Sequence, residues 1–567
     1  MQNKTIPIAL SREQVRDRKR RGPKGRRANA AAQAEVRAVL GDAPLRRDLL
    51  IENLHRIQDH YGCLSAAHLA ALADEMRMAQ SEVFEVASFY HHFDIVKEGE
   101  SDPAALTVRV CDGLACELGG AQELLAKLPA ILGPNVRVLH APCIGRCEQA
   151  PAAVVGQNPV PNATVEKIAS KVKAGETKHE PEAYIDDAQY RAAGGYKLLQ
   201  ECMSGARDVE SVIKAMEDSG LRGLGGAGFP AGRKWRIVRA EPSPRLMAVN
   251  IDEGEPGTFK DRVYLERDPH RFLEGMLIAA WAVGIDAIYI YLRDEYHGCR
   301  ALLERELAKL HANPPIAKMP MIELRRGAGA YICGEESAMI ESIEGKRGMP
   351  RLRPPYVAQV GLFGRPTLEH NFETLYWVRD LVQKGPEWFS AEGRHGRKGL
   401  RSFSVSGRVK SPGVKLAPAG ITIQELIDEY CGGMQDGHTF YGYLPGGASG
   451  GILPAKMNDI PLDFDTLQPY GCFIGSAAVI VLSDKDTAKA AARNLMRFFR
   501  DESCGQCTPC RSGTAKSLAL IEKPVWDAPL LAELSQVMRD ASICGLGQAA
   551  PNPVDCVVKY FPQELGS

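Results

Sequence analysis

The sequence shows no excess charge of either sign and no long uninterrupted hydrophobic run. Its 567 residues include 70 Lys plus Arg and 70 Asp plus Glu, so charge alone does not indicate a nucleic-acid-binding protein. The best candidate for a membrane span, residues 275–292, contains Gly284 and Asp286. It predicts a helix at 271–283 followed by a buried strand at 287–292. The arginine-rich beginning has no secretory hydrophobic segment. We therefore expect a cytoplasmic protein without a membrane span.

The composition is that of an ordinary globular protein, with one exception. Apolar residues make up 45% and charged residues 25% of the chain, and its length predicts roughly three to five domains. The exception is cysteine, with 15 residues. Eight of these fall into two groups, and clustered cysteines in such a chain indicate metal sites rather than disulfides.

A basic run near the beginning, residues 16–27, contains Gly and Pro among its cations. One interpretation is a patch that binds nucleic acid or another anionic surface. The other is a solvated arm, spanning residues 1–45, that docks on an acidic partner subunit. We favour the arm and expect no nucleic-acid partner, because nothing downstream supplies a nucleic-acid-binding module.

The stretch Gly220–Trp235 is the most unusual of the chain, with six glycines among its sixteen residues and Arg233 and Lys234 near its end. Glycine lets a ligand approach the backbone closely, and bare N–H groups beside cations form an anion cradle. The spacing Gly223-x-Gly225-x-x-Gly228 matches the dinucleotide fingerprint, which requires a preceding strand. Residues 209–216 instead show helical periodicity. We therefore predict a phosphate-binding loop outside a Rossmann fold, with a flexible surface loop as the alternative.

The first cysteine group comes in two pairs, each directly after a predicted strand. Cys111 and Cys116 follow the strand at 106–110, and Cys143 and Cys147 follow the strand at 136–139. Two such loops can face each other, and four thiolates suit a [2Fe–2S] cluster. Zinc also accepts four cysteines, but its structural sites usually have tighter pairs.

The second group lies in a helical region near the end of the chain. Cys504, Cys507 and Cys510 are separated by two residues each, and Cys544 follows after the length of a helix. A close triplet with a remote fourth thiolate is typical of a [4Fe–4S] cluster.

Two known families resemble these segments. Residues 46–175 look like the thioredoxin-like ferredoxin subunit of respiratory complex I. The strings GLRGLGGAGFPAGRKW, DEGEPGTFKDR and GAGAYICGEESA make residues 200–560 similar to the flavin-bearing, NADH-oxidising subunit of complex I. The resemblance implies that FMN is held by Gly223, Gly225, Gly226, Lys234, Asn250, Asp252, Glu253, Tyr331, Glu335, Asn371 and Thr374. It implies that the NAD site is lined by Phe229, Glu255, Glu336, Arg353 and Tyr356. His370 stands where the family usually has asparagine and is left out of this set.

The expected fold is a multidomain α/β and α+β protein. We predict a helical and thioredoxin-like [2Fe–2S] domain at 46–175, a linker at 176–200 and a non-Rossmann α/β flavin domain at 201–400. A β-grasp-like insert follows at 401–485, and a helical [4Fe–4S] domain occupies 486–567.

The expected activity follows from the implied cofactors. NAD exchanges two electrons as hydride and iron–sulfur clusters exchange one, so a flavin belongs between them. No protein group is expected to be catalytic; Glu255 and Glu336 would orient the nucleotide. The string at 443–464 and the complete N-terminal cysteine set look most like the beta subunit of soluble NAD-dependent formate dehydrogenase. That resemblance implies a molybdenum or tungsten pterin alpha subunit as partner, with a small ferredoxin-like subunit as a further candidate. The alternatives are the diaphorase subunit of a NAD-reducing hydrogenase, a complex I-like module, or a cluster scaffold without flavin.

Overall fold

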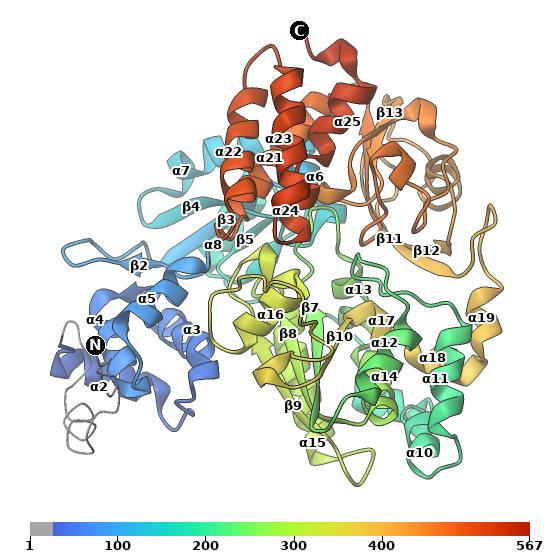
Figure 1. Ribbon diagram of the computed structural model, residues 1–567. Coiled ribbons are helices and arrows are strands. Elements are labelled where there is room, and N and C mark those ends of the chain that lie inside the picture. Colours follow the sequence, from blue (N-terminus) through green and yellow to red (C-terminus); the bar gives the residue numbers. More distant parts are fainter. Residues whose placement is uncertain (1–26, 567) are drawn as a thin grey trace, which may run out of the picture. The chain divides into compact units, whose positions relative to one another are not determined.

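The computed structural model describes residues 27–566, which form two compact units (Figure 1). The smaller unit holds the residues up to Pro103 together with Gly345–Arg347, and the larger unit holds Ala104–Glu344 and the chain from Gly348 onward. Apart from Arg27, the predicted basic run at 16–27 lies outside the described residues.

The smaller unit is helical. Its core contains Val36, Leu54, Leu72 and Val83. It comprises α2 (Ala30–Leu40), α3 (Leu50–Tyr61), α4 (Ala66–Met76) and α5 (Gln80–Phe89), with β1 (Leu64–Ser65) parallel to β2 (Ile95–Val96). Helix α2 lies within the stretch expected to be an extended arm. Asn29 accepts a hydrogen bond from the Ala32 amide at 2.6 Å and so caps this helix.

The thioredoxin-like part of the larger unit has a sheet with strand order β4-β3-β5-β6. Parallel strands β3 and β4 pair from Leu106↔Val136 to Cys111↔Ala141, so both strands end at the same edge of the sheet. The elements are β3 (Leu106–Cys111), α6 (Leu114–Leu118), α7 (Ala121–Leu132), β4 (Val136–Ala141), β5 (Ala153–Val155), β6 (Asn158–Val160) and α8 (Val165–Ala174). Val108, Leu128, Val155 and Ile168 pack in its core.

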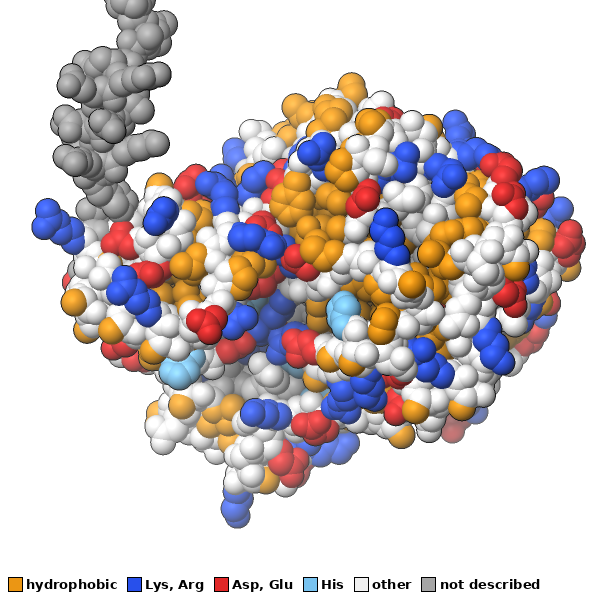
Figure 2. Space-filling view, turned by 90° about the horizontal axis from the view of Figure 1, so that it is seen from below, with side chains coloured by type: hydrophobic (Ala, Val, Ile, Leu, Met, Phe, Trp, Pro, Cys, Tyr) orange, Lys and Arg blue, Asp and Glu red, His pale blue; other side chains and the backbone are white. Residues whose placement is uncertain are grey.

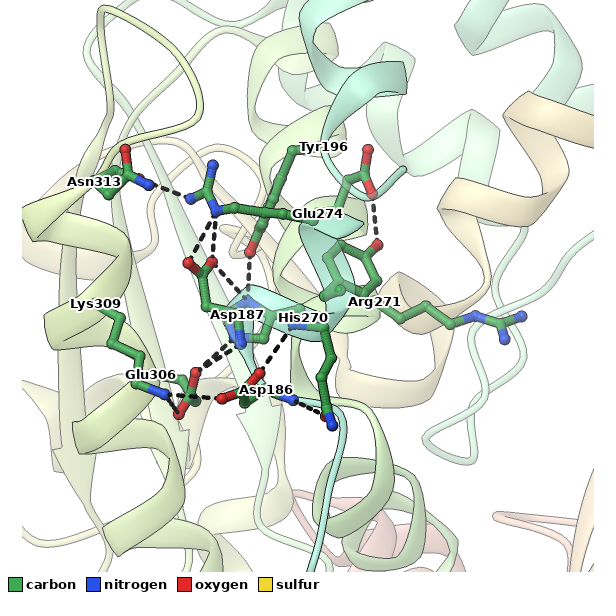
Figure 3. A network of polar contacts seen from close by, with 12 residues as sticks. Asp186, Asp187, Tyr196, His270, Arg271, Glu274, Glu306, Lys309 and Asn313 are labelled. Carbon is green, nitrogen blue, oxygen red and sulfur yellow. Dashed lines mark hydrogen bonds and ion pairs between the residues drawn. The ribbon is translucent and has the colours of Figure 1, made fainter. Parts of the chain in front are cut away.

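The prediction of a linker at 176–200 is wrong for the second half of this segment, which forms helices. Helices α9 (Asp187–Ala192) and α10 (Lys197–Met203) bury Tyr190 and Tyr196. The Tyr196 hydroxyl lies 2.7 Å from His270 Nδ1, and His270 Nε2 lies 2.8 Å from Glu306 (Figure 3). These partners belong to α14 (Pro269–Val283) and α15 (His297–Ala312). A polar, glycine-containing sequence is ordered here because its few aromatic side chains reach the domain core.

The domain predicted to hold flavin, residues 201–400 (the flavin-like domain), has a parallel sheet with strand order β10-β7-β8-β9. From β7 (Arg245–Ile251) the chain adds β8 (Ile285–Leu292) and β9 (Met321–Arg326) on one side. It then returns to place β10 (Thr367–Asn371) on the other side of β7. Such a reversal opens a crevice at the carboxyl ends of the two strands that flank it, where ligands bind in open α/β sheets. Surrounding helices are α11 (Val209–Asp218), α12 (Ala231–Ala240), α13 (Lys260–Arg267), α16 (Glu336–Ile343), α17 (Phe372–Tyr376), α18 (Val378–Lys384) and α19 (Pro386–Ser390).

A third sheet and a helical bundle complete the larger unit (Figure 1). The mixed sheet has strand order β12-β11-β15-β13-β14. Its strands are β11 (Leu400–Gly407), β12 (Gly413–Pro418), β13 (Phe440–Leu444), β14 (Leu453–Pro454) and β15 (Ala478–Ser483), with α20 (Ile423–Glu425) running into a π-helix (Leu426–Tyr430). The bundle comprises α21 (Ala488–Asp501), α22 (Thr508–Ile521), α23 (Ala528–Ala541), α24 (Gly545–Ala549) and α25 (Asn552–Tyr560).

The surface agrees with the balanced composition. Figure 2 shows basic and acidic side chains interspersed over the face in view. Among the helices of residues 27–566, none combines the length and the apolar character needed to cross a bilayer.

Candidate functional site

The first four cysteines converge at the edge where β3 and β4 end. Cys111 is the last residue of β3, Cys116 lies in α6, and Cys143 and Cys147 lie on the loop after β4. All four are buried, and the Cys143 and Cys147 sulfurs are 3.3 Å apart. Hydrogen bonds from the Cys111 and Cys147 thiols, together with the positive charge of Arg293, lower the pKa of Cys143. The two predicted cysteine pairs therefore lie together, because the parallel strands β3 and β4 end side by side.

Two buried arginines of the flavin-like domain bond to this cysteine loop. Arg293 Nη2 donates to the Cys143 carbonyl at 2.6 Å. Arg262 Nε donates to the Gly145 carbonyl at 2.9 Å, and its guanidinium also pairs with Glu148. The sequence analysis missed both residues, because they lie more than a hundred positions from the loop in sequence.

The second four cysteines line one cavity. Cys504, Cys507, Cys510 and Cys544 surround it together with Ile332, Pro350 and Leu546. Cys507 precedes α22, Cys510 lies in its first turn, and Cys544 precedes α24. Burial raises the pKa of Cys544 to about 12 and that of Cys510 to about 11. Four thiols around one small apolar space are what a cubane cluster requires.

The strand-order reversal between β7 and β10 places two predicted residues side by side. Asn250 and Asn371 are register partners at the carboxyl ends of these strands. Asn250 Nδ2 donates to the Gly334 carbonyl at 2.9 Å, and Asn371 Nδ2 donates to Asp261 at 2.7 Å. Lys234 Nζ bonds to the Glu369 carbonyl at 3.0 Å and to its carboxylate at 3.1 Å. Glu369, which the sequence analysis missed, thus lies in the same crevice.

The glycine loop runs between α11 and α12 and reaches this crevice. Because a helix leads into it, the prediction that it is not a Rossmann turn agrees with the structure. The Leu224 amide donates to the Thr374 hydroxyl at 3.0 Å. A Cβ added at Gly225 would lie 3.0 Å from the Asn371 Cβ, and Gly226 has a φ of +132°. A side chain at position 225 would therefore crowd Asn371, and glycine lets the loop approach that residue closely.

The two acids after β7 have different surroundings. Burial raises the pKa of Asp252, and within residues 27–566 its Oδ2 atom has no hydrogen-bond partner. Glu253 is engaged instead: its carboxylate accepts the amides of Asp261 at 2.8 Å and Arg262 at 3.1 Å, and the Tyr296 hydroxyl at 2.8 Å. Glu253 therefore caps α13, and its side chain is committed to the protein.

Tyr331 forms hydrogen bonds through both its hydroxyl and its backbone amide. Its hydroxyl donates to Glu255, whose other carboxylate oxygen accepts the Ser449 hydroxyl at 2.6 Å. Burial raises the pKa of Glu255, and the hydrogen bonds from Ser449 and Tyr331 oppose that shift. The Tyr331 amide donates to the buried Glu502 at 2.8 Å, two residues before Cys504.

The remaining predicted residues lie nearer the surface. Phe229 and Tyr356 are 39% and 55% exposed, so their rings are open to solvent. Arg353 pairs with Glu335 and, at 2.9 Å, with Glu336. Glu335 also caps α16 through the amides of residues 337 and 338. Burial, and then the charge of Glu369, raise the pKa of Glu336. His370 is buried and accepts the Trp235 indole N–H at 2.8 Å, a packing role that agrees with its omission.

Comparison with known families defines the class of protein. Residues 36–176 match the thioredoxin-like [2Fe-2S] ferredoxin family, residues 216–380 match the Nuo51 FMN-binding domain, and residues 490–567 match the NADH-ubiquinone oxidoreductase-F iron-sulfur binding region. The cofactors of this class are FMN, NAD, a [2Fe–2S] cluster and a [4Fe–4S] cluster. The described residues fit them: two sets of four thiols converge, and the crevice carries a glycine cradle and the unpartnered Asp252 oxygen.

Individual relatives narrow this class to a family. An NADH-quinone oxidoreductase subunit of Rhizobium meliloti is 39% identical over 390 residues, which cover 66% of this chain and 92% of the relative. The mitochondrial NADH-ubiquinone oxidoreductase 51 kDa subunit of Neurospora crassa is 40% identical over 374 residues, 62% of this chain and 76% of the relative. The chain belongs to the family of this 51 kDa NADH-ubiquinone oxidoreductase subunit.

A solved structure matches almost the whole chain. A chain of an NAD+-reducing [NiFe]-hydrogenase in the H2-reduced state is 33% identical, with a TM-score of 0.81. The match covers 92% of this chain and 94% of the hydrogenase chain. The combination of ferredoxin-like, FMN-binding and iron–sulfur regions in one chain therefore has a structural precedent.

Proposed function

We propose that this chain is the diaphorase subunit of a soluble NAD-linked dehydrogenase, passing electrons between NAD(H) and iron–sulfur clusters through FMN. One observation carries the proposal: the loops of the β7–β10 crevice bond to both cysteine regions. Arg293 joins the carbonyls of Glu253 and Cys143, and the Tyr331 amide bonds to Glu502 beside Cys504. Direct contact of this kind suits electron transfer over short distances.

The residues of the crevice would hold the flavin. Backbone amides of Gly225 and Gly226 with Lys234 suit its phosphate. Gly223 would act through the shape of the loop, because its own amide donates to the Phe229 carbonyl at 2.8 Å. Asn250, Asp252 and Asn371 supply polar groups at the strand ends, and Thr374 adds a hydroxyl from α17. FMN bound there would supply the chemistry that links two-electron exchange with NADH to one-electron exchange with the clusters. Glu253 would act indirectly, by fixing the first turn of α13.

The nucleotide would enter over the exposed rings. Phe229 and Tyr356 offer aromatic faces for stacking on nicotinamide and adenine. Glu255 and Glu336 would orient polar groups of the nucleotide, and Arg353 would attract its phosphates. Because Glu336 and Arg353 already pair with one another, we infer that the nucleotide exchanges this ion pair for its own contacts.

The eight cysteines would hold the clusters. We assign Cys111, Cys116, Cys143 and Cys147 to the [2Fe–2S] cluster, and Cys504, Cys507, Cys510 and Cys544 to the [4Fe–4S] cluster. The meeting of each set supports the assignment.

For the partner we propose the molybdenum or tungsten pterin alpha subunit of a formate dehydrogenase. The resemblance of residues 443–464 to the formate dehydrogenase beta subunit supports it, and the presence of all four N-terminal cysteines agrees with it. A hydrogenase partner is the second candidate, favoured by the match to the NAD+-reducing [NiFe]-hydrogenase over 92% of this chain.

The division of labour is tested on the purified chain reconstituted with FMN. It should oxidise NADH with a dye acceptor but should not reduce the dye with formate or hydrogen alone. Co-purification from the source cell then identifies the partner by its metal: molybdenum or tungsten supports the formate assignment, and nickel supports hydrogenase. Formate turnover by the isolated chain would contradict the proposal, and a visible spectrum without bound flavin would indicate a cluster scaffold.

A further inference from the structure

Arg293 follows β8 directly and contacts two loops at once. Its Nη2 donates to the Cys143 carbonyl at 2.6 Å, and its Nη1 donates to the Glu253 carbonyl. Glu253 belongs to the loop after β7, and Cys143 belongs to the cysteine loop after β4. A single guanidinium therefore ties the backbone of the candidate flavin site to the backbone of the candidate [2Fe–2S] site.

The surroundings of Arg293 hold its charge in place. The side chain is only 4% exposed, and its Nε donates to Glu295 at 3.1 Å. The guanidinium lies over the Tyr296 ring at 5.0 Å, and the Tyr296 hydroxyl is fixed by Glu253 at 2.8 Å. A buried cation with fixed partners keeps more of its electrostatic effect than a mobile surface cation.

We propose that Arg293 is a positioning residue that sets the reduction potential and geometry of the [2Fe–2S] cluster from the flavin side. The inference rests on the proposed function, because it takes Cys143 as a cluster ligand. Reduction adds negative charge to the cluster, and a nearby buried cation favours the reduced form. Cluster potentials respond to net charge, and Arg293 places a buried positive charge beside Cys143. Its second bond, to Glu253, makes the flavin loop part of the same support.

The test uses the full chain with its clusters and two substitutions at one position. Arg293→Met removes the charge and both carbonyl hydrogen bonds while keeping a side chain of similar length. Arg293→Lys keeps the charge but cannot donate to both carbonyls in the fixed geometry of the guanidinium fork. The matched control is Arg325→Met. Arg325 is 1% exposed, lies in the neighbouring strand β9 and bonds to Glu323 at 2.7 Å.

The readouts are the midpoint potential and the g-values of the [2Fe–2S] signal in an EPR redox titration. We expect R293M to lower the midpoint potential, and R293K to stay near the native potential with altered g-values. R325M should leave both unchanged. Selective loss of the [2Fe–2S] signal in R293M, with the [4Fe–4S] signal and flavin retained, also supports positioning.

Native potential and native g-values in both Arg293 variants would overturn the inference. If R293M does not fold, R293K alone decides it, and unchanged g-values would then overturn the inference. Failure of the proposed function looks different, since the unsubstituted protein would then carry no bound flavin or no [2Fe–2S] signal.

Discussion

At the scale of single residues, Gly145 shows how closely the cysteine loop approaches the flavin-like domain. It has a φ of +69°, and a Cβ added there would overlap the Tyr296 hydroxyl. Two separate costs follow for any other residue: a left-handed backbone and a steric overlap with a side chain that is itself bonded to Glu253. Together they amount to about 2–5 kcal/mol.

We therefore predict that Gly145→Ala displaces the loop and lowers [2Fe–2S] occupancy. The measurement is the iron content together with the intensity of the [2Fe–2S] EPR signal, relative to the [4Fe–4S] signal of the same sample. Gly175→Ala is the matched control. It has the same φ of +69° in the same domain, but nothing lies within 4 Å of its added Cβ. Equal signal loss in both variants would show that backbone strain, not the contact with Tyr296, matters.

Residue identities were predictable where spacing alone carries the chemistry. The two cysteine sets were read from their separation, and the structure brings the members of each together. Glu253 was different: its motif suggests a flavin contact, yet its carboxylate caps α13. Nothing in the local sequence says which way a carboxylate beside a glycine turn will point, since the decision depends on where the next helix begins.

At the scale of elements, α9 and α10 dock on the flavin-like domain through the polar network of Figure 3. The buried Glu306 is its centre. It accepts the Tyr184 hydroxyl at 2.6 Å and the Asp187 amide at 3.2 Å, and pairs with Lys309 at 2.9 Å. Burial raises the pKa of Glu306, but hydrogen bonds from Tyr184, His270 and Lys309 outweigh it and lower the value from 4.5 to about 2.

This shift predicts an acid-dependent stability. A carboxyl group whose pKa is lower when folded contributes stability that is complete above its unfolded pKa, and that contribution is lost as pH falls through the folded pKa. Glu306 should therefore contribute about 3 kcal/mol or slightly more at neutral pH, diminishing between pH 4.5 and about 2. We expect Glu306→Gln to lower the melting temperature at pH 7 and to differ less from the native protein near pH 3. Glu304→Gln, on the exposed face of the same helix, should match the native protein at both pH values.

Strands and helices with clear periodicity were predicted close to their observed ends. The strand expected at 287–292 is β8 (Ile285–Leu292), and the helix expected at 271–283 is α14. The errors fell on α2, α9 and α10, in stretches expected to be extended or linking. Side chains cap α2 and α9 but not α10. All three helices are stabilised by a few buried side chains, and such tertiary contacts leave little trace in local composition.

At the scale of the whole molecule, the two cysteine sets lie in different parts of the larger unit, which also touch directly where Asn494 of α21 donates to the Asp112 carbonyl at 2.8 Å. One set belongs to the thioredoxin-like sheet and the other to the C-terminal bundle. Because neither set shares a ligand with the other, losing one cluster should leave the other in place.

We predict that Cys507→Ser removes one cubane EPR signal and spares the [2Fe–2S] signal. NADH oxidation with a dye that accepts electrons directly from the flavin should persist, because the crevice residues are untouched. The measurements are low-temperature EPR of the reduced protein and the dye-linked rate. Persistence of both cluster signals would contradict the ligand assignment. Cys299 is buried and is assigned to neither cluster, so Cys299→Ser serves as the control and should retain both signals.

By itself, the sequence determined the cofactor classes and the chain order of the domains, because cysteine spacing and glycine-rich phosphate loops are local patterns imposed by the ligand. The tertiary structure decided how those sites are joined. The return of β10 beside β7 made Asn250 and Asn371 neighbours, and the end of β8 put Arg293 between two loops. Such contacts join residues that are distant in sequence, and strand order and register bring them together in ways that no local pattern encodes.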